Sequence, residues 1–174
     1  MNRSLALASL LMVFPMLAPA SADQAEESRR LTETAGGFSF VPPETWQARA
    51  VPGLKYKIAF GPVQDGFASN INVVDEAFTG ALDAYVNANK AALERALKKV
   101  RIVKQEAFRT TAGLPGARLI VECEQNDKPL RQTFYFFGTA GMKFVVTCST
   151  TAAGGEKLDP VFERAMKTFR LEKP

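Results

Sequence analysis

The side chains that most often perform catalysis are scarce in this sequence, which contains no histidine. This absence removes the commonest general base, the Ser–His and Cys–His nucleophile pairs, and most ligand sets for transition metals. No serine lies in a Gly-x-Ser-x-Gly motif, and the glycine-rich stretches lack the Lys-Ser/Thr ending of a phosphate-binding loop. We therefore expect no catalytic or metal-binding residues and no cofactor.

A pair of carboxylates is the remaining candidate for acid–base chemistry. Glu122 and Glu124 lie on the same face of one expected strand, a geometry that glycosidases can use. Arg118 shares this face and Arg131 lies on the neighbouring strand, so the pattern favours a solvated ladder of cross-strand charges. An enzyme that uses only carboxylates and lysines is the alternative function.

The N-terminus is typical of a cleaved export signal. Residues 1–22 have a short basic start, an apolar middle interrupted by Pro15, and a small-residue end before a cleavage site between Ala22 and Asp23. The apolar part is shorter than the ~20 residues that a membrane-spanning helix needs, which disfavours a membrane anchor. We expect a soluble periplasmic or secreted protein, with residues 23–36 as a polar tether.

Two cysteines in an exported chain raise the question of a disulfide. Cys123 and Cys148 fall on the first and third strands of an expected antiparallel meander, about 9.6 Å apart. A disulfide needs Cα atoms within about 7 Å, so we predict two buried free thiols.

The charge balance argues against a nucleic-acid partner. Without Arg3 of the export signal, the 22 basic residues become 21, against 18 acidic residues. Basic and acidic side chains alternate along most of the chain, whereas a nucleic-acid surface concentrates Lys and Arg on one face.

Apolar residues recur at every second position, then at every third or fourth position, then at every second position again, and finally at every third or fourth position. This pattern indicates strands, a helix, further strands and a final helix. The first helix is expected from Leu82 to about Val100 with Thr79 as its N-cap, and the second begins at Asp159-Pro160. Strands are expected at 38–40, 54–62, 69–78, 101–108, 117–125, 131–138 and 143–150.

Four consecutive aromatics, Phe134 to Phe137, place large side chains on both faces of one strand, so both faces must be covered. This predicts an α+β fold: an α-β-α sandwich in which a mainly antiparallel sheet of about six strands is covered by a helix on each face. Pro42 and Pro43 end the first strand, and Trp46 folds back as an apolar cover rather than forming an exposed epitope.

Several segments carry a family resemblance over nearly the whole domain: FSFVPPETWQ, FGPVQDGFASNINVVDEAFTGALDAY, GLPGARLIVECEQNDKPLRQTFYFFGTAGMKFVVTCST and VFERAMKTFRL. The chain resembles the PsbP-like family, especially its DcrB-type bacterial envelope members. The resemblance implies a single α-β-α domain over residues 37–172 and a non-catalytic accessory or assembly role. Photosynthetic members use histidine-containing metal sites, which this chain cannot form.

Two segments are candidates for contact with an envelope protein partner. Phe67 lies at an expected hairpin tip, and the end of the first helix carries Lys98, Lys99, Arg101 and Lys104. The alternatives are that Phe67 folds inward and that the cations only complement the helix C-terminus. Contact with anionic lipid would be weak, because no apolar wedge adjoins these charges. We expect a non-catalytic monomer that recognises a protein or envelope component.

Overall fold

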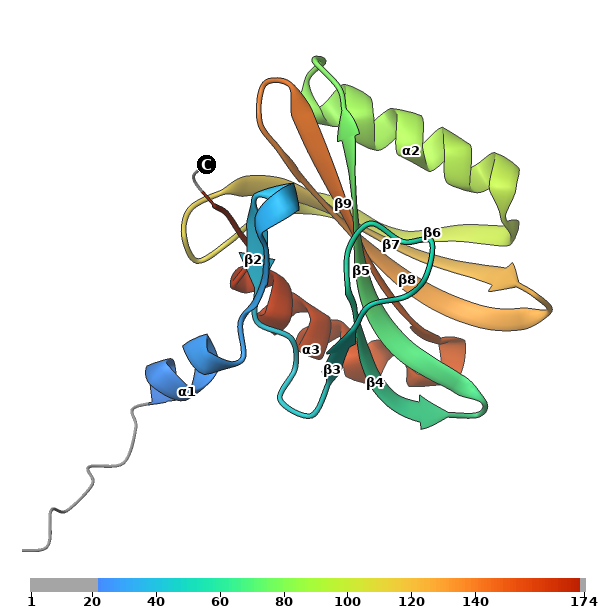
Figure 1. Ribbon diagram of the computed structural model, residues 1–174. Coiled ribbons are helices and arrows are strands. Elements are labelled where there is room, and N and C mark those ends of the chain that lie inside the picture. Colours follow the sequence, from blue (N-terminus) through green and yellow to red (C-terminus); the bar gives the residue numbers. More distant parts are fainter. Residues whose placement is uncertain (1–21, 173–174) are drawn as a thin grey trace, which may run out of the picture.

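The computed structural model describes residues 22–172, which form a mixed α/β fold around a large antiparallel sheet (Figure 1). This main sheet has seven strands, and each is antiparallel to its neighbours. In spatial order they are β3 (Gln47–Arg49), β4 (Ile58–Gln64), β5 (Phe67–Ala77), β9 (Met142–Thr151), β8 (Lys128–Gly138), β7 (Pro115–Gln125) and β6 (Lys98–Arg109).

A second sheet of three short strands joins the two ends of the described chain. In it, β2 (Phe38–Phe40) lies between β1 (Leu31–Glu33) and β10 (Arg170–Leu171). The helices are α1 (Ala22–Ser28), α2 (Leu82–Ala96) and α3 (Gly155–Lys167), with short 3-10 turns at Thr34–Gly36 and Ala152–Gly154.

The aromatic run on β8 separates two hydrophobic cores, as its sequence predicts. Phe134 and Phe136 pack with Tyr85 and Val86 of α2 on one face of the main sheet. Tyr135 and Phe137 belong to the core on the other face, which α3 covers. The prediction that both faces are covered is therefore confirmed.

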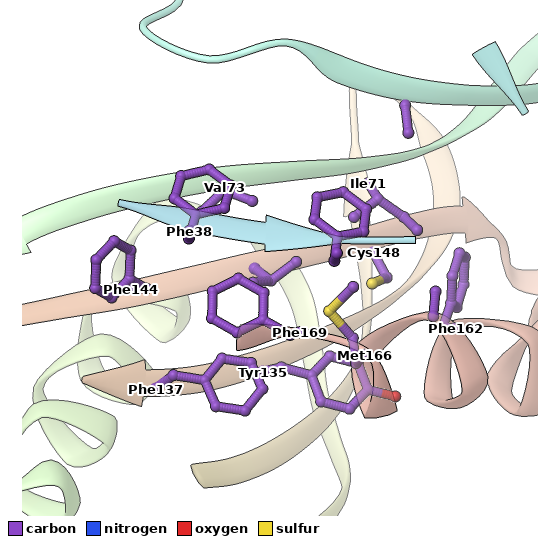
Figure 2. Packing of buried hydrophobic residues seen from close by; sticks show 14 of the residues in the cluster. Phe38, Ile71, Val73, Tyr135, Phe137, Phe144, Cys148, Phe162, Met166 and Phe169 are labelled. Carbon is purple, nitrogen blue, oxygen red and sulfur yellow. The ribbon is translucent and has the colours of Figure 1, made fainter. Parts of the chain in front are cut away.

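The core on the α3 side also contains the second sheet, which the sequence pattern did not predict. Figure 2 shows Phe169 between Phe38 of β2 and Phe137 of β8. The rings of Phe137 and Phe169 stack with centroids 4.5 Å apart, and those of Phe38 and Phe169 stack at 5.7 Å. Trp46 meets Phe162 of α3 edge-on, so it covers this core as expected. The face opposite α2 is thus covered by a helix and a small sheet together, and the main sheet has seven strands rather than about six.

Residues 31–36, assigned to a polar tether by composition, are part of the fold. Leu31 is buried, and β1 pairs with β2. Arg30 donates hydrogen bonds to the Thr168 carbonyl at 3.0 Å and to Ser39 Oγ at 3.2 Å. These contacts are long-range, so the polar composition of the segment did not reveal them. The predicted export signal, apart from Ala22, lies outside the described residues.

Two predicted helix ends differ in the structure. The N-cap of α2 is Ala81 rather than Thr79, and no side chain caps it. The last helix begins at Gly155, which leaves Pro160 inside it. Asp159 does not cap this helix, because its carboxylate instead accepts hydrogen bonds from Arg131. Within residues 22–172 we find no helix with the length and apolar character needed to cross a membrane.

Both cysteines are buried free thiols, as predicted. Cys123 on β7 faces the α2-side core, Cys148 on β9 faces the α3-side core, and β8 lies between the two strands. Burial raises the pKa of each thiol, which disfavours the reactive thiolate.

We therefore expect both thiols to resist labelling in the native protein and to react rapidly once it is unfolded. The measurement is thiol titration with a chromogenic disulfide reagent, with and without denaturant. A protein purified without reductant that shows no free thiol in denaturant would contradict the assignment.

Candidate functional site

The four candidate cations lie on an edge strand rather than at a helix end. The chain leaves the helical conformation at Leu97, and Lys99 has a positive φ of 52°. Lys98, Lys99, Arg101 and Lys104 then belong to β6, the last strand of the main sheet. The helical assignment is wrong here because the apolar side chains that followed the helical spacing beyond Leu97, such as Val100, pack from a strand against the α2-side core.

Each of these cations has a carboxylate partner. The ion pairs are Lys98–Asp127 at 3.7 Å, Lys99–Glu124 at 2.6 Å, Arg101–Glu122, and Lys104–Glu106 at 2.7 Å. The four cationic side chains are 53% to 76% exposed, whereas those of Glu106, Glu122 and Glu124 are 19% to 31% exposed. Lys99, Arg101 and Lys104 therefore form the outer rim of the ladder with their carboxylates behind them, whereas Asp127 is 89% exposed beside Lys98.

The predicted charge ladder is present, and Arg131 of the neighbouring strand takes part in it as expected. Arg131 on β8 donates to Glu122 at 2.9 Å and to Asp159 of α3 at 2.6 Å. Arg118 pairs with Glu106 and with Glu163 of α3 rather than with Glu122. The ladder thus continues from the sheet edge to the helix that covers this face.

The electrostatics keep the carboxyl groups of Glu106 and Glu122 ionised. The hydrogen bond from Lys104 lowers the pKa of Glu106, which Arg118 lowers further. Burial would raise the pKa of Glu122, but hydrogen bonds from Arg101 and Arg131 outweigh it, and the net pKa is lowered. A general acid at neutral pH needs a raised carboxyl pKa, so these groups suit binding and structure better than proton transfer.

The pairing of β6 with β7 is interrupted in its first half and regular in its second half. Register shifts occur between Lys98 and Arg101 and between Ile102 and Lys104. From Lys104 to Arg109 the two strands pair without interruption. The outer edge of this regular stretch has no neighbouring strand in the described part of the chain.

Phe67, the other candidate contact, is not at the hairpin tip. Asp65 and Gly66 form the tip, with φ values of 52° and 69°. Phe67 begins β5, is half-buried and packs against the α2-side core. It lies on a different strand from the four cations, with β9, β8 and β7 between β5 and β6. The exposed large apolar side chains of β4 and β5 are Val63, which is 68% exposed, and Val74, which is 57% exposed.

A cleft of about 940 Å³ lies between the second sheet and the start of β9. Its charged side chains are Glu27, Arg30, Arg170 and Glu172. Its apolar walls are Met142, Phe144 and Leu171. The sequence analysis missed this site because its charges come from the expected tether and from the last described residues, and no local pattern links the two segments.

The charges of the cleft are paired with one another. Glu27 accepts from Arg30 at 2.8 Å and from Arg170 at 2.7 Å. Glu172 accepts from Arg170 at 3.1 Å and from the buried Ser39 hydroxyl. The Arg30 hydrogen bond lowers the pKa of Glu27, and the Ser39 hydrogen bond lowers the pKa of Glu172. In the described residues no group of three or more Cys, Asp or Glu side chains is arranged to hold a metal ion.

Comparisons with solved structures place this architecture among known folds. Cyanobacterial PsbP (CyanoP) from Synechocystis sp. PCC 6803 superposes with a TM-score of 0.60 at 15% identity, over 82% of this chain and 91% of CyanoP. PA94, a protein of unknown function from Pseudomonas aeruginosa, gives 0.58 at 15% identity, over 75% and 99%. LpqN, involved in cell envelope biogenesis of Mycobacterium tuberculosis, gives 0.56 at 14%, over 78% and 83%.

These similarities establish a PsbP-like fold. They agree with the resemblance noted in the sequence at the level of fold. No protein-family model matches the sequence, and no curated protein is significantly similar to it.

Proposed function

We propose that this chain is an exported, non-catalytic accessory protein of the bacterial envelope, of the DcrB type, that binds another envelope protein through the outer edge of β6. The observation that carries the proposal is the cationic rim of this strand. β6 has five cations and one carboxylate, and four of its cations are more than half exposed. Charged rims of this kind steer and select protein partners.

Export is supported by the character of residues 1–22, with a basic start, an apolar middle and a small-residue cleavage site. The proposed location is periplasmic or secreted. LpqN, which shares the fold, is itself described as involved in cell envelope biogenesis. A monomer is the proposed free state, because the cations of two β6 edges would repel one another.

A carboxylate-based enzyme is the alternative, and its site would be the cleft beside the second sheet. The cleft combines concavity with clustered titratable groups, which an active site requires. Against this role, the pKa values of both Glu27 and Glu172 are lowered, so neither carboxyl is poised to donate a proton at neutral pH.

The test is affinity capture from a bacterial envelope extract with the mature chain, residues 23–174. The variant replaces Lys98, Lys99, Arg101 and Lys104 with glutamine. We expect a specific protein to be enriched on the wild type and reduced about tenfold or more on this edge variant, which corresponds to ~1.4 kcal/mol of binding free energy.

The matched control replaces four exposed cations on other surfaces with glutamine, and so has the same net charge: Arg49, Lys57, Arg95 and Lys157. It should capture the same protein as the wild type. Equal loss of capture in both variants would show that the effect depends only on net charge. If the wild type enriches no protein, the proposed function is rejected.

A further inference from the structure

The regular half of β6 presents unpaired backbone groups along its open edge. In an antiparallel pair, residues alternate between those whose N–H and C=O bond to the neighbouring strand and those whose groups point away. The Thr110 N–H bonds to the Leu114 carbonyl at 3.0 Å, just beyond the last paired residues of β6 and β7. Counting back along the register, Phe108, Glu106 and Lys104 bond to β7.

It follows that the backbone groups of Gln105, Ala107 and Arg109 point outward. Two observations agree with this assignment of outward-facing residues. Arg109 is opposite Pro115, which has no N–H to donate across the pair. The Arg109 carbonyl accepts a hydrogen bond from Lys167 Nζ at 2.9 Å, so it faces away from β7.

Because Lys167 already bonds to the outward carbonyl of Arg109, the residues whose outward backbone groups can still pair with another strand are Gln105 and Ala107. The side chains of both residues are exposed, and the methyl group of Ala107 leaves room for a backbone to approach. In contrast, the first half of β6 contains the two register shifts, which twist an edge out of the geometry needed for further pairing. A strand can be added only over the stretch from Lys104 to Arg109.

We infer that β6 accepts an extended acidic segment of the partner as an additional strand, paired with the backbone of Gln105 and Ala107. This inference rests on the proposed function and names the chemistry of the partner. Backbone hydrogen bonds supply affinity in such strand addition, and alternate side chains supply specificity. Acidic residues of the added strand lie beside the exposed Lys104 and Arg109, one on each face of the sheet.

The same charges select against a second copy of this chain. Self-pairing over the same stretch would bring two cations, Lys104 and Arg109, and one carboxylate, Glu106, against an identical set. Like charges on adjacent strands are destabilising, so self-pairing is disfavoured while an acidic strand is attracted.

The decisive variant is Ala107→Pro. Proline removes the outward N–H of residue 107, which bonds to no strand of the described fold, and proline is tolerated on edge strands in this orientation. Ala107→Ser, which keeps the N–H, is the matched control. Both should retain the melting temperature of the wild type within a few degrees, which shows that β6 still pairs with β7.

The probe is the acetylated and amidated six-residue peptide Glu-Glu-Val-Val-Glu-Glu, whose adjacent glutamates place carboxylates on both faces of an added strand. A second peptide has the same sequence with N-methylated backbone amides, and a third has lysine in place of glutamate. Binding is measured by fluorescence anisotropy, and the position of binding by protection of the Gln105 and Ala107 amides from hydrogen exchange.

We expect the glutamate peptide to bind the wild type and Ala107→Ser equally. Binding should be about tenfold weaker to Ala107→Pro and for the N-methylated peptide, and absent for the lysine peptide. Equal binding to Ala107→Pro, no binding to the wild type, or self-association of the wild type through this edge would each overturn the inference. If the envelope partner is still captured by Ala107→Pro at wild-type levels, strand addition fails while the proposed function stands.

Discussion

Replacement of Arg131 by leucine is expected to lower the free energy of unfolding by about 3–5 kcal/mol. The Arg131 side chain is only 7% exposed and joins Glu122 of β7 to Asp159 of α3. Its removal leaves the largely buried Asp159 carboxylate without its charged partner, and an uncompensated buried charge costs more than the ion pair contributes. The effect should appear in urea denaturation at neutral pH.

Arg49→Leu is the control, because Arg49 is an exposed residue on the short edge strand β3 and its loss should change stability by no more than about 0.5 kcal/mol. The double variant with both Arg131 and Asp159 replaced by leucine should be more stable than Arg131→Leu alone, since no unpaired Asp159 charge remains. A loss below ~1 kcal/mol in Arg131→Leu would show that water solvates the network.

Deletion of residues 23–36 is expected to cost about 4 kcal/mol or more. The buried Leu31 contributes ~1.5–3 kcal/mol, and each hydrogen bond from the charged Arg30 contributes roughly the same amount. The deletion also removes the strand that pairs with β2. Thermal and urea unfolding of the shortened chain would measure the loss.

A shorter deletion, of residues 23–28, distinguishes the contribution of Arg30 and Leu31 from that of the polar helix α1. It retains Arg30 and Leu31 and removes the exposed ion pairs of Glu27, so we expect a loss of at most ~1 kcal/mol. If both deletions have the same small effect, residues 31–36 contribute little to the fold.

Local periodicity predicted six of the seven strands of the main sheet, and it missed the three-residue strand β3. The aromatics from Phe134 to Phe137 required two covered faces, and the meander order correctly separated Cys123 from Cys148. Both inferences depend on alternation within single strands and on short turns, which are encoded locally.

The parts that could not be predicted depend on long-range pairing. The strands β1 and β10 have three and two residues, too few to show any period. The helical spacing that ran on past Leu97 also concealed the start of β6, because Val100 and Ile102 face the same core from a strand. Composition thus identified the four cations of the edge, but neither their carboxylate partners nor the charges of the cleft.

The stacking of Phe169 between Phe38 and Phe137 makes folding of the N-terminal strands depend on the C-terminal residues. A nascent chain that still lacks α3 and the residues after it leaves Phe38 and the rest of that interior open to water, however long it waits at the ribosome. Stable folding of this domain therefore requires synthesis to have passed Phe169. Under the proposed export, this delay keeps the chain unfolded until it reaches a secretion channel.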